Sequence, residues 1–166
     1  VDTTAPTVSS ISTTADNQSL VTITDNITVT FSEAMEPSYV TTSTSDTYCA
    51  GTIRVSSDNF SSCVKMSSEP VSSNSNKTFT LDPYDNLTRL TTYLTRVTTG
   101  VKDTAGNAMS SQYETSSGFT TDNISTAKLT VSNSSLTSGT TYYWKVVASD
   151  PKGGSAQSET WSFTVQ

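Results

Sequence analysis

Apolar and polar residues alternate along most of this chain, in short runs that predict β-strands. The alternation is clearest at 27–31, where Ile27, Val29 and Phe31 are separated by threonines. A period of two residues is the signature of a strand with one buried face. The same pattern predicts further strands at residues 8–11, 53–55, 64–66, 79–81, 93–97 and around Phe119. Seven short strands of this kind are typical of an antiparallel β-sandwich.

Turn-forming residues separate the predicted strands. Ser-Asn at 73–74, Asp-Pro at 82–83 and Ala-Gly-Asn at 105–107 are combinations that favour tight turns. Residues 33–37 form the one helix-like stretch. We expect a turn there that Pro37 ends, because proline lacks the amide N–H that a continuing helix needs. The chain is therefore predicted to be all-β.

The composition supports strands and limits the partners. Serine and threonine make up 63 of the 166 residues, and charged residues only 14%. Threonine packs well on a pleated sheet, so this excess indicates polar strand faces and not disorder. With a net charge of −6 and a pI near 4.4, the chain lacks the clustered Lys and Arg that bind nucleic acid. No apolar run approaches the length of about 18 residues that predicts a membrane span.

The sequence offers little for catalysis. It has no histidine, the commonest general base near neutral pH, and no nucleophile elbow, phosphate loop or Cys/His metal cluster. Two carboxylate pairs, Glu33 with Glu36 and Asp82 with Asp85, are interpreted as solvated turn acids, because glycosidase chemistry needs two carboxyls that face each other across a cleft. We therefore expect that the protein is not an enzyme.

The two cysteines, Cys49 and Cys63, are predicted to form a disulfide. The turn-forming segment 56–59 lies between them and predicts a hairpin that places them roughly opposite each other. Cross-strand pairing brings two Cβ atoms within reach of a disulfide, and the composition suits an oxidising compartment. The alternative is a pair of free, buried thiols, since cysteines in strands often act as small hydrophobic residues.

Three segments resemble one known family: residues 5–8 (Ala-Pro-Thr-Val), 27–35 (Ile-Thr-Val-Thr-Phe-Ser-Glu-Ala-Met) and 100–108 (Gly-Val-Lys-Asp-Thr-Ala-Gly-Asn-Ala). Through them, residues 5–121 are similar to the bacterial Ig-like module of S-layer and other cell-surface proteins. The resemblance implies an immunoglobulin-like β-sandwich over residues 1–121, used in tandem as a spacer, adhesive stalk or lattice element without catalysis. Residues 40–76, which carry both cysteines, depart from the family pattern.

Residues 128–166 resemble the C-terminal half of a fibronectin type III module. The segment 136–142 (Leu-Thr-Ser-Gly-Thr-Thr-Tyr) is similar to its tyrosine corner, where the hydroxyl of a buried ring bonds the backbone, and 161–165 to its last strand. We therefore expect an incomplete fibronectin type III-like half-module at 122–166. One side of its unfinished core is predicted to consist of Tyr142, Trp144, Val146, Trp161 and Phe163.

Three explanations for the missing half remain open. Strands of a neighbouring copy can complete the half-module, since exposed strand edges with aromatic faces are templates for β-augmentation. The C-terminal strands can instead fold onto the first sandwich and bury Trp144 and Trp161 there. Finally, the sequence can be a piece, or two joined pieces, of a longer chain. Two exposed tryptophans would otherwise form a patch that soluble monomers rarely tolerate.

Calcium is the one cofactor for which the sequence gives candidates. Carboxylate, amide and backbone oxygens in loops suit this hard ion. Asp2, Asp103 and Asn107 lie near one expected end of the sandwich, and Asp122 lies at the next junction. The alternative is that Asp103 and Asn107 simply stabilise a turn through side chain to backbone hydrogen bonds.

Seven Asn-x-Ser/Thr motifs are possible glycosylation sites. Chance raises this number, because serine and threonine are so abundant, and such motifs carry a glycan only where the source organism attaches one. The asparagines are Asn17, Asn26, Asn59, Asn76, Asn86, Asn123 and Asn133.

Two classes of function follow from these observations. The favoured one is a structural module, extracellular or on a bacterial-type cell surface, that associates with itself or with neighbouring modules of a longer surface protein into a filament, lattice or stalk. The alternative is an adhesive module that binds carbohydrate or protein through loops of the first sandwich. Its candidate residues lie in and beside the 40–76 segment, at Tyr39, Tyr48 and Phe60, although aromatic residues in such loops more often serve packing.

Overall fold

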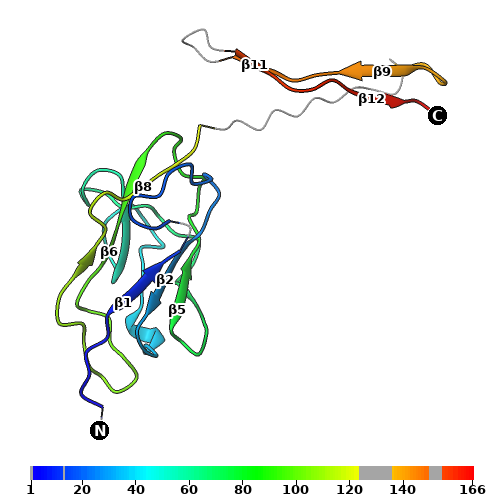
Figure 1. Cartoon of the computed structure of the whole chain (residues 1–166). Coiled ribbons are helices and arrows are strands. Elements are labelled where there is room, and N and C mark those ends of the chain that lie inside the picture. The colour runs from blue at the N-terminus through cyan, green and yellow to red at the C-terminus, as the bar shows by residue number, and fades with distance from the viewer. Residues whose placement is uncertain (1, 13, 124–135, 150–154) are drawn as a thin grey trace. The chain divides into compact units, whose positions relative to one another are not determined.

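The computed structural model describes residues 2–12, 14–123, 136–149 and 155–166. The chain divides into two compact units, Val1–Ile124 and Ser125–Gln166. Figure 1 labels several strands of each unit, and its colour runs from blue at the N-terminus to red at the C-terminus. Each unit is described by itself below.

The first unit is a β-sandwich. Its strands are β1 (Val8–Ile11), β2 (Ile27–Phe31), β3 (Ile53–Ser56), β4 (Val71–Ser73), β5 (Thr78–Leu81), β6 (Thr92–Val97), β7 (Tyr113–Glu114) and β8 (Phe119–Thr120). One sheet has the order β1-β2-β5-β4, and the other has the order β3-β6-β7 with β8 also paired to β6. All of these strand pairs are antiparallel. The structure thus confirms the predicted all-β sandwich.

The predicted alternation on 27–31 decides how the first sheet packs. Ile27, Val29 and Phe31 are buried in one apolar cluster that draws on both sheets. The ring of Phe31 meets that of Phe79 on β5 edge to face, with centroids 5.9 Å apart, a geometry that aromatic pairs favour. On the other face, the hydroxyls of Thr30 and Thr78 lie 3.1 Å apart. Threonine therefore provides cross-strand contacts on the polar face, which is the role expected from its abundance.

The second sheet contributes the opposite half of the core. In the β3–β6 register Ile53 lies opposite Val97, and both are fully buried. Tyr93 on β6 stacks against Phe119 on β8, with ring centroids 5.5 Å apart. The Tyr93 hydroxyl accepts a hydrogen bond from the amide of Thr88 at 3.0 Å, so its polar end is satisfied while the ring is buried.

Three details differ from the sequence-based expectation. Residues 64–66 form no strand; Met66 makes an isolated bridge to Pro83 and is nevertheless fully buried. Two short strands, β4 and β7, were not predicted, because neither shows an apolar alternation. Pro37 does not end a turn but begins a 3-10 helix, Pro37–Tyr39, where its fixed φ is favourable and its missing N–H is not needed.

The second unit is a long β-hairpin. Its strands are β9 (Thr141–Trp144), β10 (Val147–Ser149), β11 (Ser155–Gln157) and β12 (Trp161–Thr164). β9 pairs with β12 and β10 with β11, both antiparallel. Between these pairs, the amide of Ser158 donates to the carbonyl of Val146 at 2.9 Å, so the two ladders continue one another. Within the described part of the chain, no helix is long and apolar enough to cross a bilayer.

Candidate functional site

The hairpin of the second unit gathers large aromatic side chains on one face. Trp144 and Trp161 are direct cross-strand partners, and their ring centroids are 4.6 Å apart. Tyr142 lies opposite Phe163, with stacked rings whose centroids are 5.8 Å apart. Because side chains two residues apart share a face of a strand, Tyr142 and Trp144 belong to the same face. We call the four rings, together with Val146, the aromatic face.

The described residues of the hairpin leave the aromatic face largely uncovered. Trp144 is 46% exposed, Trp161 43% and Phe163 45%. Indeed, none of the described side chains between residues 136 and 147 or between 157 and 166 is buried. The opposite face also carries exposed apolar residues, Tyr143 and Val147. The described residues of the hairpin therefore form a two-stranded ladder without a core of its own, and isolated ladders of this size are marginal in water.

Tyr142 also fixes the entry of the chain into the hairpin. Its hydroxyl accepts a hydrogen bond from the backbone amide of Thr137 at 2.9 Å, as expected of a tyrosine at the corner position. Gly139, which lies between them, has φ 79° and no atom within 4 Å of the place of a Cβ. The turn there thus needs glycine for its conformation and not for lack of space.

Three carboxylates of the first unit meet at the turn that precedes residue 107. Oxygens of Asp2, Glu33 and Asp103 all lie within 4.8 Å of one another. Asn107 joins this group: its side-chain amide donates to the Asp103 carboxylate at 2.8 Å and to the Asp2 carbonyl at 3.2 Å. The three residues proposed from the sequence are thus brought together. Glu33, interpreted from the sequence as a solvated turn acid, completes the cluster because the chain path brings residues 2, 33 and 103 side by side.

The negative charges of the three carboxylates repel one another. Burial raises the pKa of Glu33, and the negative charges of Asp2 and Asp103 raise it further. Burial also acts to raise the pKa of Asp103, but hydrogen bonds from Asn107 and from the amides of Ala105 and Gly106 outweigh it, so that this pKa is lowered. Carboxylate oxygens in this arrangement are ligands of the type that Ca²⁺ uses. Asp122, the fourth acid named from the sequence, lies elsewhere and pairs with Arg89 at 3.2 Å.

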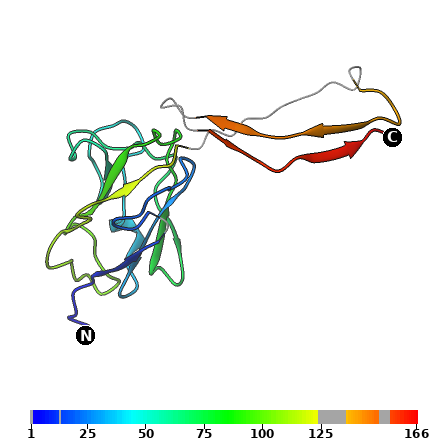
Figure 2. The same cartoon turned by 45° about the horizontal axis from the view of Figure 1, so that its top comes forward.

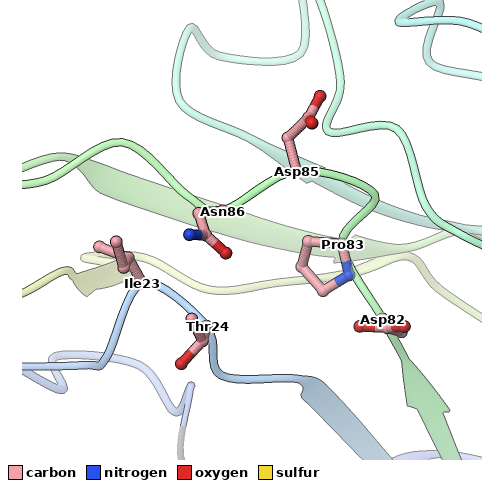
Figure 3. Close-up of a pocket in the computed structure, with 6 residues that line it drawn as sticks. All are labelled: Ile23, Thr24, Asp82, Pro83, Asp85 and Asn86. Carbon is pink, nitrogen blue, oxygen red and sulfur yellow. The ribbon is translucent and has the colours of Figure 1, made fainter.

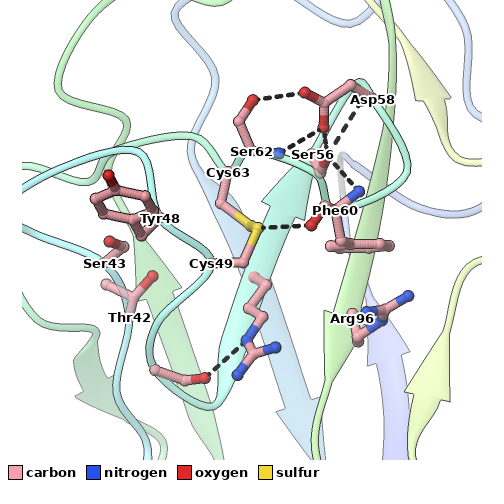
Figure 4. Close-up of a disulfide and its surroundings, with 12 residues drawn as sticks. Thr42, Ser43, Tyr48, Cys49, Ser56, Asp58, Phe60, Ser62, Cys63 and Arg96 are labelled. Carbon is pink, nitrogen blue, oxygen red and sulfur yellow. Dashed lines mark hydrogen bonds between the residues drawn. A yellow bond between two sulfur atoms is a disulfide. The ribbon is translucent and has the colours of Figure 1, made fainter.

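Cys49 and Cys63 are joined by a disulfide, with their Cα atoms 5.0 Å apart (Figure 4). The bond is the predicted one, but its setting differs. Neither cysteine lies in a strand, and β3 lies between them in the sequence. The amide of Cys63 donates to the carbonyl of Thr47 at 2.8 Å, so the disulfide ties two irregular segments together. The predicted cross-strand pair on a hairpin is therefore wrong in its geometry.

The tip of this loop is organised by Asp58. Its carboxylate accepts hydrogen bonds from the Ser56 hydroxyl and from the amide and hydroxyl of Ser62, at 2.8, 2.9 and 2.6 Å (Figure 4). These hydrogen bonds, with the Ser62 hydroxyl first, lower the pKa of Asp58 to about 2. Asp58 thus holds the loop as an ionised acceptor at neutral pH.

The three aromatic residues proposed for ligand binding have different surroundings. The guanidinium of Arg96 lies over the ring of Phe60, with its central carbon 3.7 Å from the ring centroid. The ammonium nitrogen of Lys102 lies 4.6 Å from the ring centroid of Tyr39. Both are engaged in cation–π contacts within the unit. Tyr48 is highly exposed, at 78%. Contacts within the Ig-like unit therefore explain the positions of two of these three aromatic residues, Phe60 and Tyr39.

Comparison with known proteins assigns the first unit to a family. Residues 2–121 match the family model described as a bacterial Ig-like domain. The chain belongs to the bacterial Ig-like domain family. The match agrees with the resemblance seen in residues 5–8, 27–35 and 100–108. A search among curated proteins finds no significant match.

Solved structures with a similar fold include fragments of a bacterial S-layer protein, SbsC. The structure of its N-terminal part matches with a TM-score of 0.51 and 16% identity, and the match covers 98% of this chain and 44% of that one. The structure of its domains 1–6 matches with a TM-score of 0.50 and 19% identity, covering 93% of this chain and 19% of that one. The chain thus spans less than half the length of each protein, and identities this low show a shared fold.

The Ig-like unit also has a small pocket of about 240 Å³ beyond the end of β5 (Figure 3). Figure 3 shows Asn86 turned towards Thr24, while the carboxylate of Asp85 points away from both. The volume is below the roughly 300–1,000 Å³ typical of small-molecule sites. Its lining residues are Ile23, Thr24, Asp82, Pro83, Asp85 and Asn86.

The glycosylation motifs lie mostly at the surface of the Ig-like unit. Asn76 is half-buried, and Asn133 lies outside the described residues. The structure therefore leaves room for a glycan at most of these positions, and their modification stays a prediction. The exposed asparagines are Asn17, Asn26, Asn59, Asn86 and Asn123.

Proposed function

We propose that this chain is a non-catalytic structural module of a bacterial surface or secreted protein, and that it associates through its C-terminal hairpin. The partner is a second copy of the chain or a neighbouring module of a longer surface protein. The Ig-like unit serves as the folded repeat, and the hairpin serves as the joint between repeats. The products of this association are filaments, lattices or stalks.

The observation that carries the proposal is the open aromatic face. Four aromatic rings are ordered against one another across β9 and β12, yet none of the described residues of the hairpin forms a second layer over them. An exposed aromatic face with unpaired strand edges is the surface that strand addition completes. The resemblance of residues 128–166 to the C-terminal half of a fibronectin type III module supports the same proposal, because in a complete module a second sheet packs against these strands.

The fold of the first unit suits this role. Bacterial Ig-like domains resemble the tandem modules of surface proteins, and the similar solved structures belong to a protein described as an S-layer protein. The Cys49–Cys63 disulfide and the acidic, serine- and threonine-rich composition are in keeping with an extracellular setting.

A matched pair of variants tests the proposal. Trp161→Ser removes a ring from the aromatic face, whereas Tyr143→Ser removes an exposed ring from the opposite face of the same hairpin. Electron microscopy of the full chain is expected to show regular assemblies for the native chain and for Tyr143→Ser, and none for Trp161→Ser. Equal assembly of both variants would exclude the aromatic face as the joint. A native chain that stays unassembled and binds a glycan array would favour the adhesive alternative.

A further inference from the structure

The outward face of the first sheet of the Ig-like unit carries no charge. None of the residues of β1, β2, β5 and β4 is charged, whereas the strands of the other sheet carry Arg54, Arg96 and Glu114. On β2 and β5 the outward residues are threonines, which alternate with buried apolar residues. In both views β1, β2 and β5 lie side by side (Figures 1 and 2). We call this surface the neutral face, and its hydroxyl-bearing residues are Ser10, Thr28, Thr30, Ser73, Thr78 and Thr80.

The hydroxyls of the neutral face form a regular grid. Residues directly opposite each other in a ladder share a face, and the register places Ser10 beside Thr30 and Thr30 beside Thr78. The hydroxyl oxygens of Thr30 and Thr78 are 3.1 Å apart, and those of Thr28 and Thr80 are 3.4 Å apart. The four threonines are half-buried and Ser10 is exposed. Because a hydroxyl both donates and accepts hydrogen bonds, such a face is complementary to an identical face without any opposite charges.

Charge limits which surfaces of two copies can meet. The chain has a net charge of −6, so copies repel one another, and like charges brought together in an interface are costly. Charged residues are likewise depleted from the cores of protein interfaces. Two neutral faces can meet without burying a charge in either copy. Val71, which lies opposite Thr80 on β4 and is 63% exposed, adds an apolar contact to this surface.

Growth of an assembly requires a second contact for reasons of symmetry. Where the aromatic faces of two copies cover each other, both copies use the same surface, and such a contact closes at a dimer. We propose that the neutral face provides the second contact, by docking on the neutral face of another copy. This proposal rests on the proposed association through the hairpin. With both contacts, each copy is held by one neighbour at its hairpin and by another at its neutral face, so that dimers join into an open assembly.

The neutral face is the weaker of the two contacts. Four strands about 4.8 Å apart, each about four residues long at roughly 3.4 Å per residue, give a face of roughly 250 Å². Two such faces in contact cover about 500 Å² in total, whereas stable interfaces bury roughly 1,200 Å² or more. Dimers should therefore form first, through the hairpin, and should join through their neutral faces only at higher concentration.

Sedimentation equilibrium of the full chain over a wide range of concentrations tests the proposal. We expect the native chain to pass from dimers to larger assemblies. Thr30→Lys should lose every species larger than a dimer, because it places a lysine in the middle of the neutral face of both copies. General repulsion cannot explain such a loss, since this change makes the net charge of −6 one unit less negative. If Thr30→Lys does not fold, Ser10→Lys, at the exposed edge of the same face, should give the same result.

Thr92→Lys is the matched control. The hydroxyl of Thr92 on β6 also lies beside a threonine hydroxyl, that of Thr120 at 2.9 Å, but on the other sheet. This variant should assemble like the native chain.

Trp161→Ser separates the two proposals, because it should form no dimers at low concentration and nothing larger than dimers at high concentration. Large assemblies of the neutral-face variants, the loss of large assemblies in Thr92→Lys, or a native chain that stops at dimers would overturn the neutral face as the second contact and leave the hairpin joint in place. Large assemblies of Trp161→Ser, or a native chain that stays monomeric, would overturn both.

Discussion

Trp144 and Trp161 lie directly opposite each other across the hairpin, with ring centroids 4.6 Å apart, and each remains nearly half exposed. A tryptophan buries on the order of 200 Å² in a core. Covering the exposed part of each ring would therefore contribute about 2 kcal/mol at 25 cal/mol per Å². A partner that covers the whole aromatic face gains several such contributions, which is the energetic basis of the proposed association.

The disulfide is expected to contribute measurably to the stability of the Ig-like unit. Replacement of Cys49 and Cys63 by serine should lower the free energy of unfolding by about 3 kcal/mol, because a cross-link around a loop of this length restricts the unfolded chain. Urea denaturation of the native and double-serine chains, both under oxidising conditions, measures the difference. An unchanged midpoint would mean that the irregular segments are held without the bond.

Acid should destabilise the Ig-like unit in a defined pH range. Burial acts to raise the pKa of Asp16, but hydrogen bonds from Ser116, Ser117 and Gly118 outweigh it and lower this pKa to about 2; that of Asp58 is also about 2, against an ordinary value of 3.8. Since the folded state binds these protons less readily, both groups stabilise it above pH 3.8, and this contribution is lost as the pH falls from there to about 2.

The corresponding measurement is a series of urea midpoints from neutral pH down to about pH 2. In the double variant Asp16→Asn/Asp58→Asn, the decline over this range should be shallower and the midpoint at neutral pH lower. A decline as steep as that of the native chain would show that other carboxylates govern acid unfolding.

The carboxylate cluster leads to a prediction about charge and calcium. With a chelator present, Glu33→Gln should raise the melting temperature, because burial and the charges of Asp2 and Asp103 disfavour the ionised form of Glu33. If Ca²⁺ binds Asp2, Glu33 and Asp103, added calcium should raise the melting temperature of the native chain more than that of the variant. Glu36→Gln, which removes a charge outside the cluster, is the control. A calcium effect of equal size in Glu33→Gln would exclude Glu33 as a ligand.

Gly118 is predicted to be intolerant of any side chain. Its φ is 68°, and a Cβ would lie 2.2 Å from the carbonyl oxygen of Tyr93. Gly118→Ala should therefore cost at least about 2 kcal/mol of stability, from the left-handed backbone and from the displacement of β6. Gly106→Ala is the comparison, because Gly106 has φ 93° and open space around it, so that only the backbone cost of about 1 kcal/mol applies. Similar costs for both would show that the backbone near Tyr93 adjusts freely.

The strands that build the core were predictable from the sequence, whereas the edge strands were not. β2 shows the alternation of buried and half-buried residues in full, because one of its faces lies in the core. All three residues of β4 are exposed, so no apolar pattern marks it, and its pairing depends on the neighbouring β5 alone. The alternation at 64–66 correctly indicated that Met66 is buried, but it was interpreted as a strand. A period of two residues does not distinguish a paired strand from a single buried residue in an isolated bridge.

The candidate sites were predictable where their residues lie close in sequence. The Asp103–Asn107 turn was identified because its hydrogen bonds join neighbours four residues apart. The approach of Glu33 to Asp103 and of Asp16 to Ser116 depends on the path of the whole sandwich. No local sequence pattern indicates contacts between residues this far apart in the chain. The family motif at 27–35, which contains Glu33, is the one sequence signal that relates to the contact between Glu33 and Asp103.

Sedimentation velocity of the native full chain over a wide range of concentrations tests the central claim most directly. The proposed association through the aromatic face predicts a sedimentation coefficient that rises with concentration, together with increasing protection of Trp144 and Trp161 from fluorescence quenchers. A single monomeric boundary at every concentration, from a chain whose hairpin is folded by near-ultraviolet circular dichroism, would contradict it.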